Sequence, residues 1–262
     1  MAHTNPTDLQ SHILALPPSD QWASTRTEIT DNGLDLALGI TQGNATAISD
    51  GSYKEQYGAS RSILRGPNHT KRIITINAVP GPRDAQSAYR SELAGISGSL
   101  LILQALCNLH QITDGLITIG LDGKSAIDTV SSTKPLRPQQ PDFDLLCDIR
   151  AKLLRLPIKV KWVWIKSHQD DQTQFHSLSP VAQDNVIANN IVKVYANHLL
   201  HNNTPHTNPR FSDEGWSLYL GPNKQTRFNK QRIYDYLTQP SITETGPISG
   251  ITLSTHQLTG PP

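Results

Sequence analysis

The sequence predicts an α/β fold, in which a mixed five-stranded sheet is flanked by helices. Three short strand-like segments follow one another between residues 45 and 79, which is typical of an antiparallel meander. After residue 80, strand-like segments alternate with helical ones. Because parallel strands need a crossover connection, this alternation indicates parallel pairing. We therefore expect three antiparallel strands followed by parallel strands.

The chain divides into three regions of different texture. Residues 1–43 contain "ALPPSDQW" and "TDNGLDLALGI", where prolines and an Asn-Gly pair interrupt any long period, so we expect an irregular N-terminal leader. Residues 44–200 carry the periodic segments and form the predicted domain. Residues 201–262 are rich in Asn, Thr, Pro and Ser and are expected to be a partly disordered C-terminal extension with one candidate hairpin.

Composition limits the classes of function. The chain is 36% hydrophobic and 17% charged with a net charge of +1, which argues against disorder and against a strongly polyanion-binding surface. Any contact with nucleic acid must therefore be local. No apolar run approaches the roughly 18 residues of a membrane helix, and no secretory signal is visible. We expect a soluble, monomeric intracellular protein in the cytoplasm or nucleus, without a membrane partner.

The first half of the predicted domain contains three strands and a long helix. The strands are "ATAIS", "YGASRSIL" and "KRIITINAV", separated by clusters of Gly and Pro. Apolar residues then recur in steps of four and three from Tyr89 to Cys107, which indicates an amphipathic helix that ends near His110. Asp84 is a plausible acidic start for this helix.

The second half of the domain alternates strands with helices. "GLITIGL" is typical of a strand buried on both faces, and "IKVKWVWI" alternates as a strand. "GKSAIDTV" predicts a short helix, and "DFDLLCDIRAKLLRL" predicts a longer one that Pro157 ends. Ser179 and Pro180 form an N-cap and first-turn signal for a last helix, which reaches about Leu200.

Three carboxylates stand where these elements begin or end. Asp50 closes the first strand, Asp122 closes the fourth, and Glu92 borders the apolar stripe of the long helix. If the first and fourth strands are parallel neighbours, Asp50 and Asp122 lie side by side. Acids this close need bound cations, and hard oxygen ligands favour Mg²⁺ or Mn²⁺. Two such ions about 3.5–4 Å apart would serve an in-line phosphodiester displacement.

Each acid also has a purely structural explanation. Asp50 begins "DGS", a good hairpin turn, and Asp122 begins "DG", where it could also cap the following helix. Glu92 alone would be an ordinary solvated helix residue. The metal hypothesis therefore depends on the joint order of the three acids within one topology.

Four motifs in order give the sequence a resemblance to a known family. "SDGSYK", "SELAG", "GLDGKSAID" and "WVWIKSHQDD" resemble the motifs of type 1 ribonuclease H domains, members of the ribonuclease H-like superfamily attached to retroelement reverse transcriptases. The resemblance covers residues 44 to 200 approximately. It implies a ribonuclease H-type endoribonuclease that hydrolyses the RNA strand of RNA–DNA hybrids by a two-metal mechanism. It also implies an upstream reverse transcriptase module as a possible partner.

The resemblance assigns roles to individual residues. It implies that Asp50, Glu92 and Asp122 are metal ligands, and that His168 is a loop histidine that assists proton transfer or product departure. Read from the residues alone, His168 enters a polar loop, where a neutral-pH imidazole is useful, but an ordinary surface histidine fits equally well.

The last helix departs from the family pattern at the fourth acid. The matching letters are "NVIAN", which put Asn189 where the final Asp is expected. An Asn carbonyl can ligate a hard cation without contributing charge, so we expect Asn189 to hold the second metal more weakly. Asp184, which shares a helical face with Ile187 and Ala188, is an alternative ligand.

Three functions remain open from the sequence. The first is a magnesium-dependent endonuclease acting on RNA–DNA hybrids. The second is a catalytically weakened or inactive domain of the same fold that binds nucleic acid or a partner chain. The third is a DNA-cutting enzyme of this fold, which ranks last because the Asp-Gly-Ser motif and the histidine loop favour the ribonuclease branch.

Overall fold

The computed structural model describes residues 8–167, 169–211, 216–221, 223–238 and 252–255. The main sheet consists of six strands, β1 (Arg26–Ile29), β2 (Ala45–Lys54), β3 (Tyr57–Arg65), β4 (Ile73–Ala78), β5 (Leu116–Leu121) and β6 (Lys159–Trp164). Their order is β1-β4-β3-β2-β5-β6. The first four in this order pair antiparallel, whereas β5 runs parallel to β2 and β6 runs parallel to β5. This arrangement confirms the predicted α/β fold with a mixed sheet, in which antiparallel strands are followed by parallel ones.

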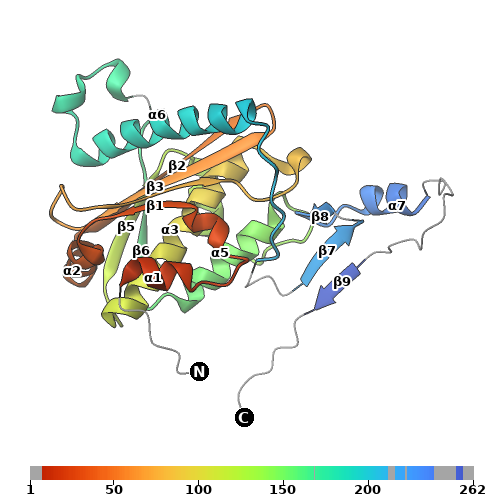
Figure 1. Cartoon of the computed structure of the whole chain (residues 1–262), viewed down its shortest axis with the longest axis horizontal. Coiled ribbons are helices and arrows are strands. Elements are labelled where there is room, and N and C mark those ends of the chain that lie inside the picture. The colour runs from red at the N-terminus through yellow and green to blue at the C-terminus, as the bar shows by residue number, and fades with distance from the viewer. Residues whose placement is uncertain (1–7, 168, 212–215, 222, 239–251, 256–262) are drawn as a thin grey trace, which may run out of the picture.

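Helices cover both faces of this sheet. The described helices are α1 (Leu9–Leu14), α2 (Leu34–Gln42), α3 (Ala88–His110), α4 (Lys124–Val130), α5 (Phe143–Arg155), α6 (Pro180–His201) and α7 (Lys230–Thr238). Figure 1 shows α6 lying along one face and α3 with α5 on the other. The largest cluster of buried apolar side chains lies on the α3 side.

The long helix α3 is the central helix of the core. Ser87 is its N-cap and accepts a hydrogen bond from the backbone N–H of Arg90 at 3.0 Å, so the helix begins four residues after the predicted Asp84. Its length and mean hydropathy of 1.4 over 18 residues would suffice to span a membrane, contrary to the sequence expectation. However, 78% of that window is buried inside the fold. We therefore interpret α3 as a core helix.

The hairpin between β2 and β3 turns later than the sequence suggests. Glu55 and Gln56 form the turn with φ of 45° and 72°, and Lys54 pairs with Tyr57 across it. Positive φ at both turn residues matches the twist of the flanking strands. Asp50 therefore lies inside β2, opposite Arg61, and the hairpin-corner explanation of this residue is wrong.

The N-terminal region is not an irregular leader where the structure describes it. Residues 9–14 and 34–42 form α1 and α2, and residues 26–29 form β1. β1 pairs antiparallel with β4, so the sheet has six strands rather than the predicted five. The hydrogen bonds that β4 offers at its free edge stabilise this short strand, which has little apolar pattern of its own.

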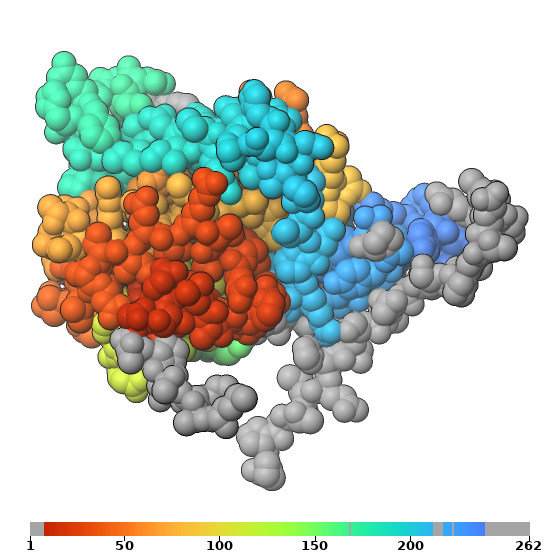
Figure 2. Space-filling view, viewed as in Figure 1, coloured from red at the N-terminus to blue at the C-terminus, as the bar shows by residue number. Residues whose placement is uncertain are grey.

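The C-terminal extension packs partly against the domain. The predicted hairpin is present as β7 (Trp216–Leu220) and β8 (Asn223–Gln225), with β9 (Thr252–Thr255) on the other side of β7. In Figure 2 the chain after α6 runs along the side of the molecule next to the N-terminal residues. Phe211 is 1% exposed and meets Trp22 edge-on at 6.1 Å. The predicted disorder of the tail falls mainly on residues outside the described ranges.

Candidate active site

The three acids predicted from the sequence meet at one end of the sheet, next to the carboxyl end of β5. Asp50 comes from β2, Glu92 from α3, and Asp122 directly follows β5. Each offers a carboxylate oxygen, and these oxygens all lie within 4.8 Å of one another. The parallel register pairs Ile48 with Gly120, so Asp50 and Asp122 each stand two residues beyond the same pair. The crossover between β2 and β5 thus brings the acids together.

Two glycines allow α3 to approach this end of the sheet closely. A Cβ at Gly51 would lie 2.5 Å from both the backbone nitrogen of Glu92 and the carbonyl carbon of Ser91. A Cβ at Gly123 would lie 3.1 Å from Cγ of Glu92. The Ser91 hydroxyl donates to the backbone carbonyl of Ser52 at 3.1 Å and fastens α3 to β2. Gly51, Gly123 and Ser91, which neighbour the three acids in the sequence, therefore determine the position of Glu92.

The electrostatics of the three acids favour a bound cation. Burial and, to a lesser degree, the neighbouring Asp122 raise the pKa of Asp50 to about 7. Loss of solvent, with Asp50 and Asp122 nearby, raises the pKa of Glu92 well above its usual value. Both shifts have the causes expected for like charges held together in a poorly solvated site.

The donor set fits a divalent ion. Asp50 Oδ2 and Glu92 Oε2 are buried and have no hydrogen-bond partner among the described residues. Buried carboxylate oxygens without a donor are costly unless a cation satisfies them. Three carboxylates that converge within 4.8 Å offer the hard oxygen ligands that Mg²⁺ and Mn²⁺ prefer.

Helix α6 brings the positive charge of Lys193 to the acids. Asn189 is half-buried on this helix, and Lys193 follows one turn later. Burial raises the pKa of Asp50, and the positive charge of Lys193 partly offsets this rise. Sequence reasoning missed Lys193, although its spacing of four from Asn189 places both on one helical face. His168 lies outside the described residues.

Asp184, the alternative fourth ligand, forms an ion pair with Arg65 away from the three acids. Its carboxylate lies 2.8 Å from the guanidinium of Arg65, and both side chains are almost fully buried. Arg65 pairs with Thr46 in the sheet, whereas Asp50 pairs with Arg61. The two positions are four residues apart on β3, or about 13 Å. The structure therefore does not bring Asp184 into the acidic cluster.

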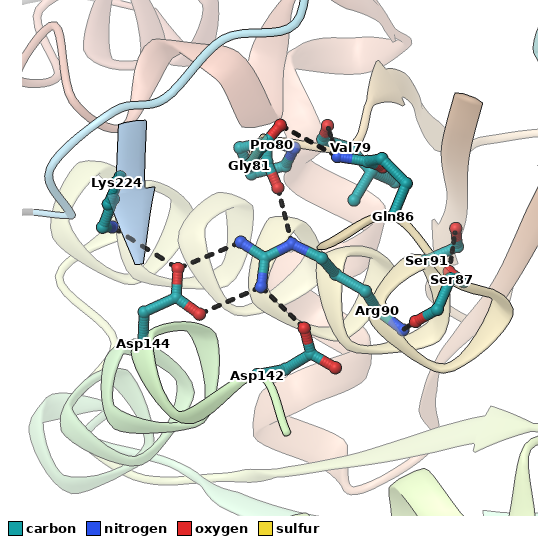
Figure 3. A network of polar contacts seen from close by, with 10 residues as sticks. All are labelled: Val79, Pro80, Gly81, Gln86, Ser87, Arg90, Ser91, Asp142, Asp144 and Lys224. Carbon is teal, nitrogen blue, oxygen red and sulfur yellow. Dashed lines mark hydrogen bonds and ion pairs between the residues drawn. The ribbon is translucent and has the colours of Figure 1, made fainter. Parts of the chain in front are cut away.

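A buried ionic network fixes the first turns of α3. The guanidinium of Arg90, which is 0% exposed, lies 2.8 Å from Asp142 and donates to both oxygens of Asp144 at 2.9 and 3.0 Å. Its Nε donates to the Pro80 carbonyl at 2.7 Å (Figure 3). Burial alone would lower the pKa of Arg90, but the two acids raise it above its usual value. Glu92 is two residues from this anchor.

The network reaches into the C-terminal extension. Lys224 of β8 is 1% exposed, and its ammonium lies 3.4 Å from Asp144 (Figure 3). The same ammonium lies 2.9 Å from the carbonyl oxygen of Pro209. Lys224 is therefore a buried ion-pair partner and not a solvated surface lysine. Arg232 also has a partner, because it pairs with Asp84 at 2.5 Å.

Comparisons with known proteins found similar solved structures at low identity. No family model and no curated protein matches the sequence. The chain is similar to the solved N-terminal RNase H domain of Rv2228c from Mycobacterium tuberculosis, with 10% identity, 61% of this chain and 98% of that chain covered, and a TM-score of 0.41. It is also similar to LC11-RNase H1 in complex with an RNA/DNA hybrid, with 9% identity, coverages of 60% and 99%, and a TM-score of 0.42. For RNase H1 from the halophilic archaeon Halobacterium salinarum NRC-1, the identity is 14%, the coverages are 53% and 97%, and the TM-score is 0.34. These identities describe a likeness of fold alone.

Proposed function

We propose that this domain is a metal-dependent endonuclease that hydrolyses the RNA strand of RNA–DNA hybrids. The observation that carries the proposal is the meeting of Asp50, Glu92 and Asp122, whose carboxylate oxygens lie within 4.8 Å of one another. Asp50 and Glu92 each carry a buried oxygen that no described residue hydrogen-bonds. The order of the four sequence motifs supports the choice of the ribonuclease branch. The hybrid would be recognised by shape and by contacts to phosphates and 2′-hydroxyls, with little base specificity.

The residues of the site divide the work. Asp50, Glu92 and Asp122 would hold Mg²⁺ or Mn²⁺, and Asn189 would add a neutral oxygen from α6. When bound, two such ions supply an activated water and stabilise the attacking and leaving oxygens of the phosphodiester. His168 would carry a proton toward the departing product. Gly51 and Gly123 keep Glu92 close enough to share the site.

A second candidate is a catalytically weakened or inactive domain that binds nucleic acid. The observation that favours it is on α6, where Lys193 places a positive charge near Asp50, and Asn189, one turn earlier, stands where the resemblance expects an acid. A cation of the protein at this place opposes the binding of a second metal ion.

The resemblance also suggests an origin. We infer that the chain derives from a retroelement, and that a reverse transcriptase module precedes it as a partner. Reverse transcriptase motifs encoded directly upstream would support this origin, and an unrelated upstream sequence would contradict it.

The test is a cleavage assay with the whole purified chain. An RNA–DNA hybrid, an RNA duplex and a DNA duplex are incubated in Mg²⁺, and we expect cleavage of the RNA strand of the hybrid alone. Asp50→Asn should abolish cleavage, whereas Asp128→Asn, a matched change of an exposed acid on α4, should not. Absence of cleavage, or cleavage that survives Asp50→Asn, would overturn the nuclease. Hybrid binding that is indifferent to Asp50→Asn and to metal would support the second candidate.

A further inference from the structure

Trp164 is held directly beside the acidic cluster. It is the last residue of β6 and pairs with Leu121, the residue before Asp122. Its indole N–H donates to the backbone carbonyl oxygen of Asp122 at 3.0 Å. The ring is therefore fixed to the same residue whose carboxylate belongs to the site.

The indole ring is open to solvent although its one polar atom is already bonded. Trp164 is 54% exposed, whereas Trp22 is 9% exposed and Trp162 packs partly buried against the core. A packed indole buries 150–250 Å² of surface, so an exposed ring forgoes much of this stabilisation. The hydrogen bond to Asp122 does not require that exposure. The open surface of the ring is thus available to a ligand at the site.

The surroundings of Trp164 suit a nucleic-acid strand. Lys124 follows Asp122 by two residues, Lys166 follows Trp164 by two residues, and both lysines are exposed. Exposed ammonium groups bind phosphates, and an aromatic surface packs against the apolar parts of nucleotides. In a paired strand the bases stack within the duplex, so the sugar is the apolar surface that a side chain at the groove reaches.

We propose that Trp164 is a substrate-binding residue. Its exposed ring packs against the sugar of the nucleotide next to the phosphodiester bond that is cleaved at Asp50, Glu92 and Asp122. Its N–H meanwhile fixes the backbone of Asp122. The chemical identity of the ligand rests on the proposed function. The contact contributes to the affinity for the hybrid, which is measured without cleavage.

The first experiment measures the affinity of the whole chain for a labelled RNA–DNA hybrid by fluorescence anisotropy. Ca²⁺ replaces Mg²⁺, so that binding is separated from hydrolysis. Trp164→Ala should weaken binding about tenfold, because the aromatic contact is lost. Trp164→Phe should stay within about threefold, because a ring remains. Leu154→Ala changes another exposed apolar residue, on α5, and should leave the affinity unchanged. Thermal melting verifies that each variant folds.

Two further readouts separate a ring contact from a structural role. Binding of the hybrid should quench the tryptophan fluorescence of the wild type, and Trp164→Phe should lose most of this quench. Trp164→Ala should leave the slope of log Kd against log salt unchanged, because no phosphate contact is removed. Lys124→Ala should instead reduce that slope by about one.

Several outcomes overturn the inference. They are a folded Trp164→Ala variant that binds like the wild type, a Trp164→Phe variant that weakens binding as much as Trp164→Ala, and a quench that persists in Trp164→Phe. A wild type that does not bind the hybrid at all overturns the inference and the nuclease together. Binding that depends on Trp164, combined with no cleavage in Mg²⁺, overturns the nuclease and supports the inference.

Discussion

The ammonium of Lys224 lies 3.4 Å from a carboxylate oxygen of Asp144, and both side chains are almost completely buried. Asp144 and Asp142 also pair with Arg90, so two cations balance two acids inside the protein. Lys224 belongs to the C-terminal hairpin, whereas Arg90 stands two residues before Glu92. The hairpin therefore completes a neutral buried cluster at the start of the helix that carries a candidate metal ligand.

This balance predicts that Lys224→Met destabilises the protein. Methionine fills most of the space but leaves two buried acids with one cation, so the free energy of unfolding should fall by about 2–3 kcal/mol. Urea unfolding followed by circular dichroism measures the change. Lys230→Met removes an exposed lysine of α7 and should alter stability by less than about 0.5 kcal/mol. Equal stabilities for the two variants would contradict the role of Lys224.

The raised pKa of Asp50 predicts how the stability of the metal-free protein depends on pH. The pKa is about 7 in the folded chain, against a reference of 3.8. Between these values the folded state retains a proton that the unfolded state has lost, so the stabilisation is complete below about pH 4 and disappears as the pH rises through 7. In chelator at about pH 8, Asp50→Asn should therefore be more stable than the wild type by on the order of 2 kcal/mol.

Urea unfolding at about pH 5 and pH 8 distinguishes this effect from a general one. The gain from Asp50→Asn should shrink at the lower pH, where Asp50 is already protonated in the folded state. Asp128→Asn should show no such dependence, because its side chain is exposed. Added Mg²⁺ should stabilise the wild type and not Asp50→Asn. A gain that is equal at both pH values would show that repulsion within the site is not its cause.

Local patterns were sufficient to predict the parts of the fold that depend on local chemistry. The apolar period of α3 and the apolar runs of β2 to β5 are visible in short windows of sequence, and crossover connections imply parallel pairing. Asp50 and Asp122 could therefore be placed side by side before the structure was known. Glu92 followed because α3 must pack its apolar stripe on the same sheet.

Features that depend on distant partners could not be predicted. β1 has the sequence "RTEI", in which only Ile29 is a large apolar residue, so its place in the sheet comes from pairing with β4. Lys224 reads as a solvated basic residue, because its partner Asp144 lies 80 residues earlier. Likewise, Asp184 shared a promising helical face, but only the structure shows that Arg65 pairs with it.

The neutral residue in α6 predicts a gain of function. If Asn189 belongs to the proposed metal site, Asn189→Asp adds a charged oxygen to that site and should raise the affinity for Mg²⁺ by about tenfold, with faster cleavage of the hybrid. Isothermal titration with Mg²⁺ and cleavage rates measure the two effects. Asn190→Asp makes the same change at the next, exposed residue and should have little effect on either. Identical responses of the two variants would remove Asn189 from the site.

Close packing between β2 and α3 predicts that Gly51→Ala damages the site. The added methyl group would lie 2.5 Å from the backbone nitrogen of Glu92, which cannot rotate away, so α3 must move away from Asp50. We expect a loss of stability of about 1–3 kcal/mol and Mg²⁺ binding weakened at least about tenfold.

Gly98→Ala, a change on α3, meets its nearest atom at 3.6 Å and should be tolerated, with a gain of up to about 1 kcal/mol from helix propensity. Because both variants add one methyl group at a glycine, a difference between them in Mg²⁺ affinity isolates the distance between Glu92 and Asp50 as the cause. Unchanged Mg²⁺ affinity in a folded Gly51→Ala variant would mean that the acids do not bind metal as one cluster.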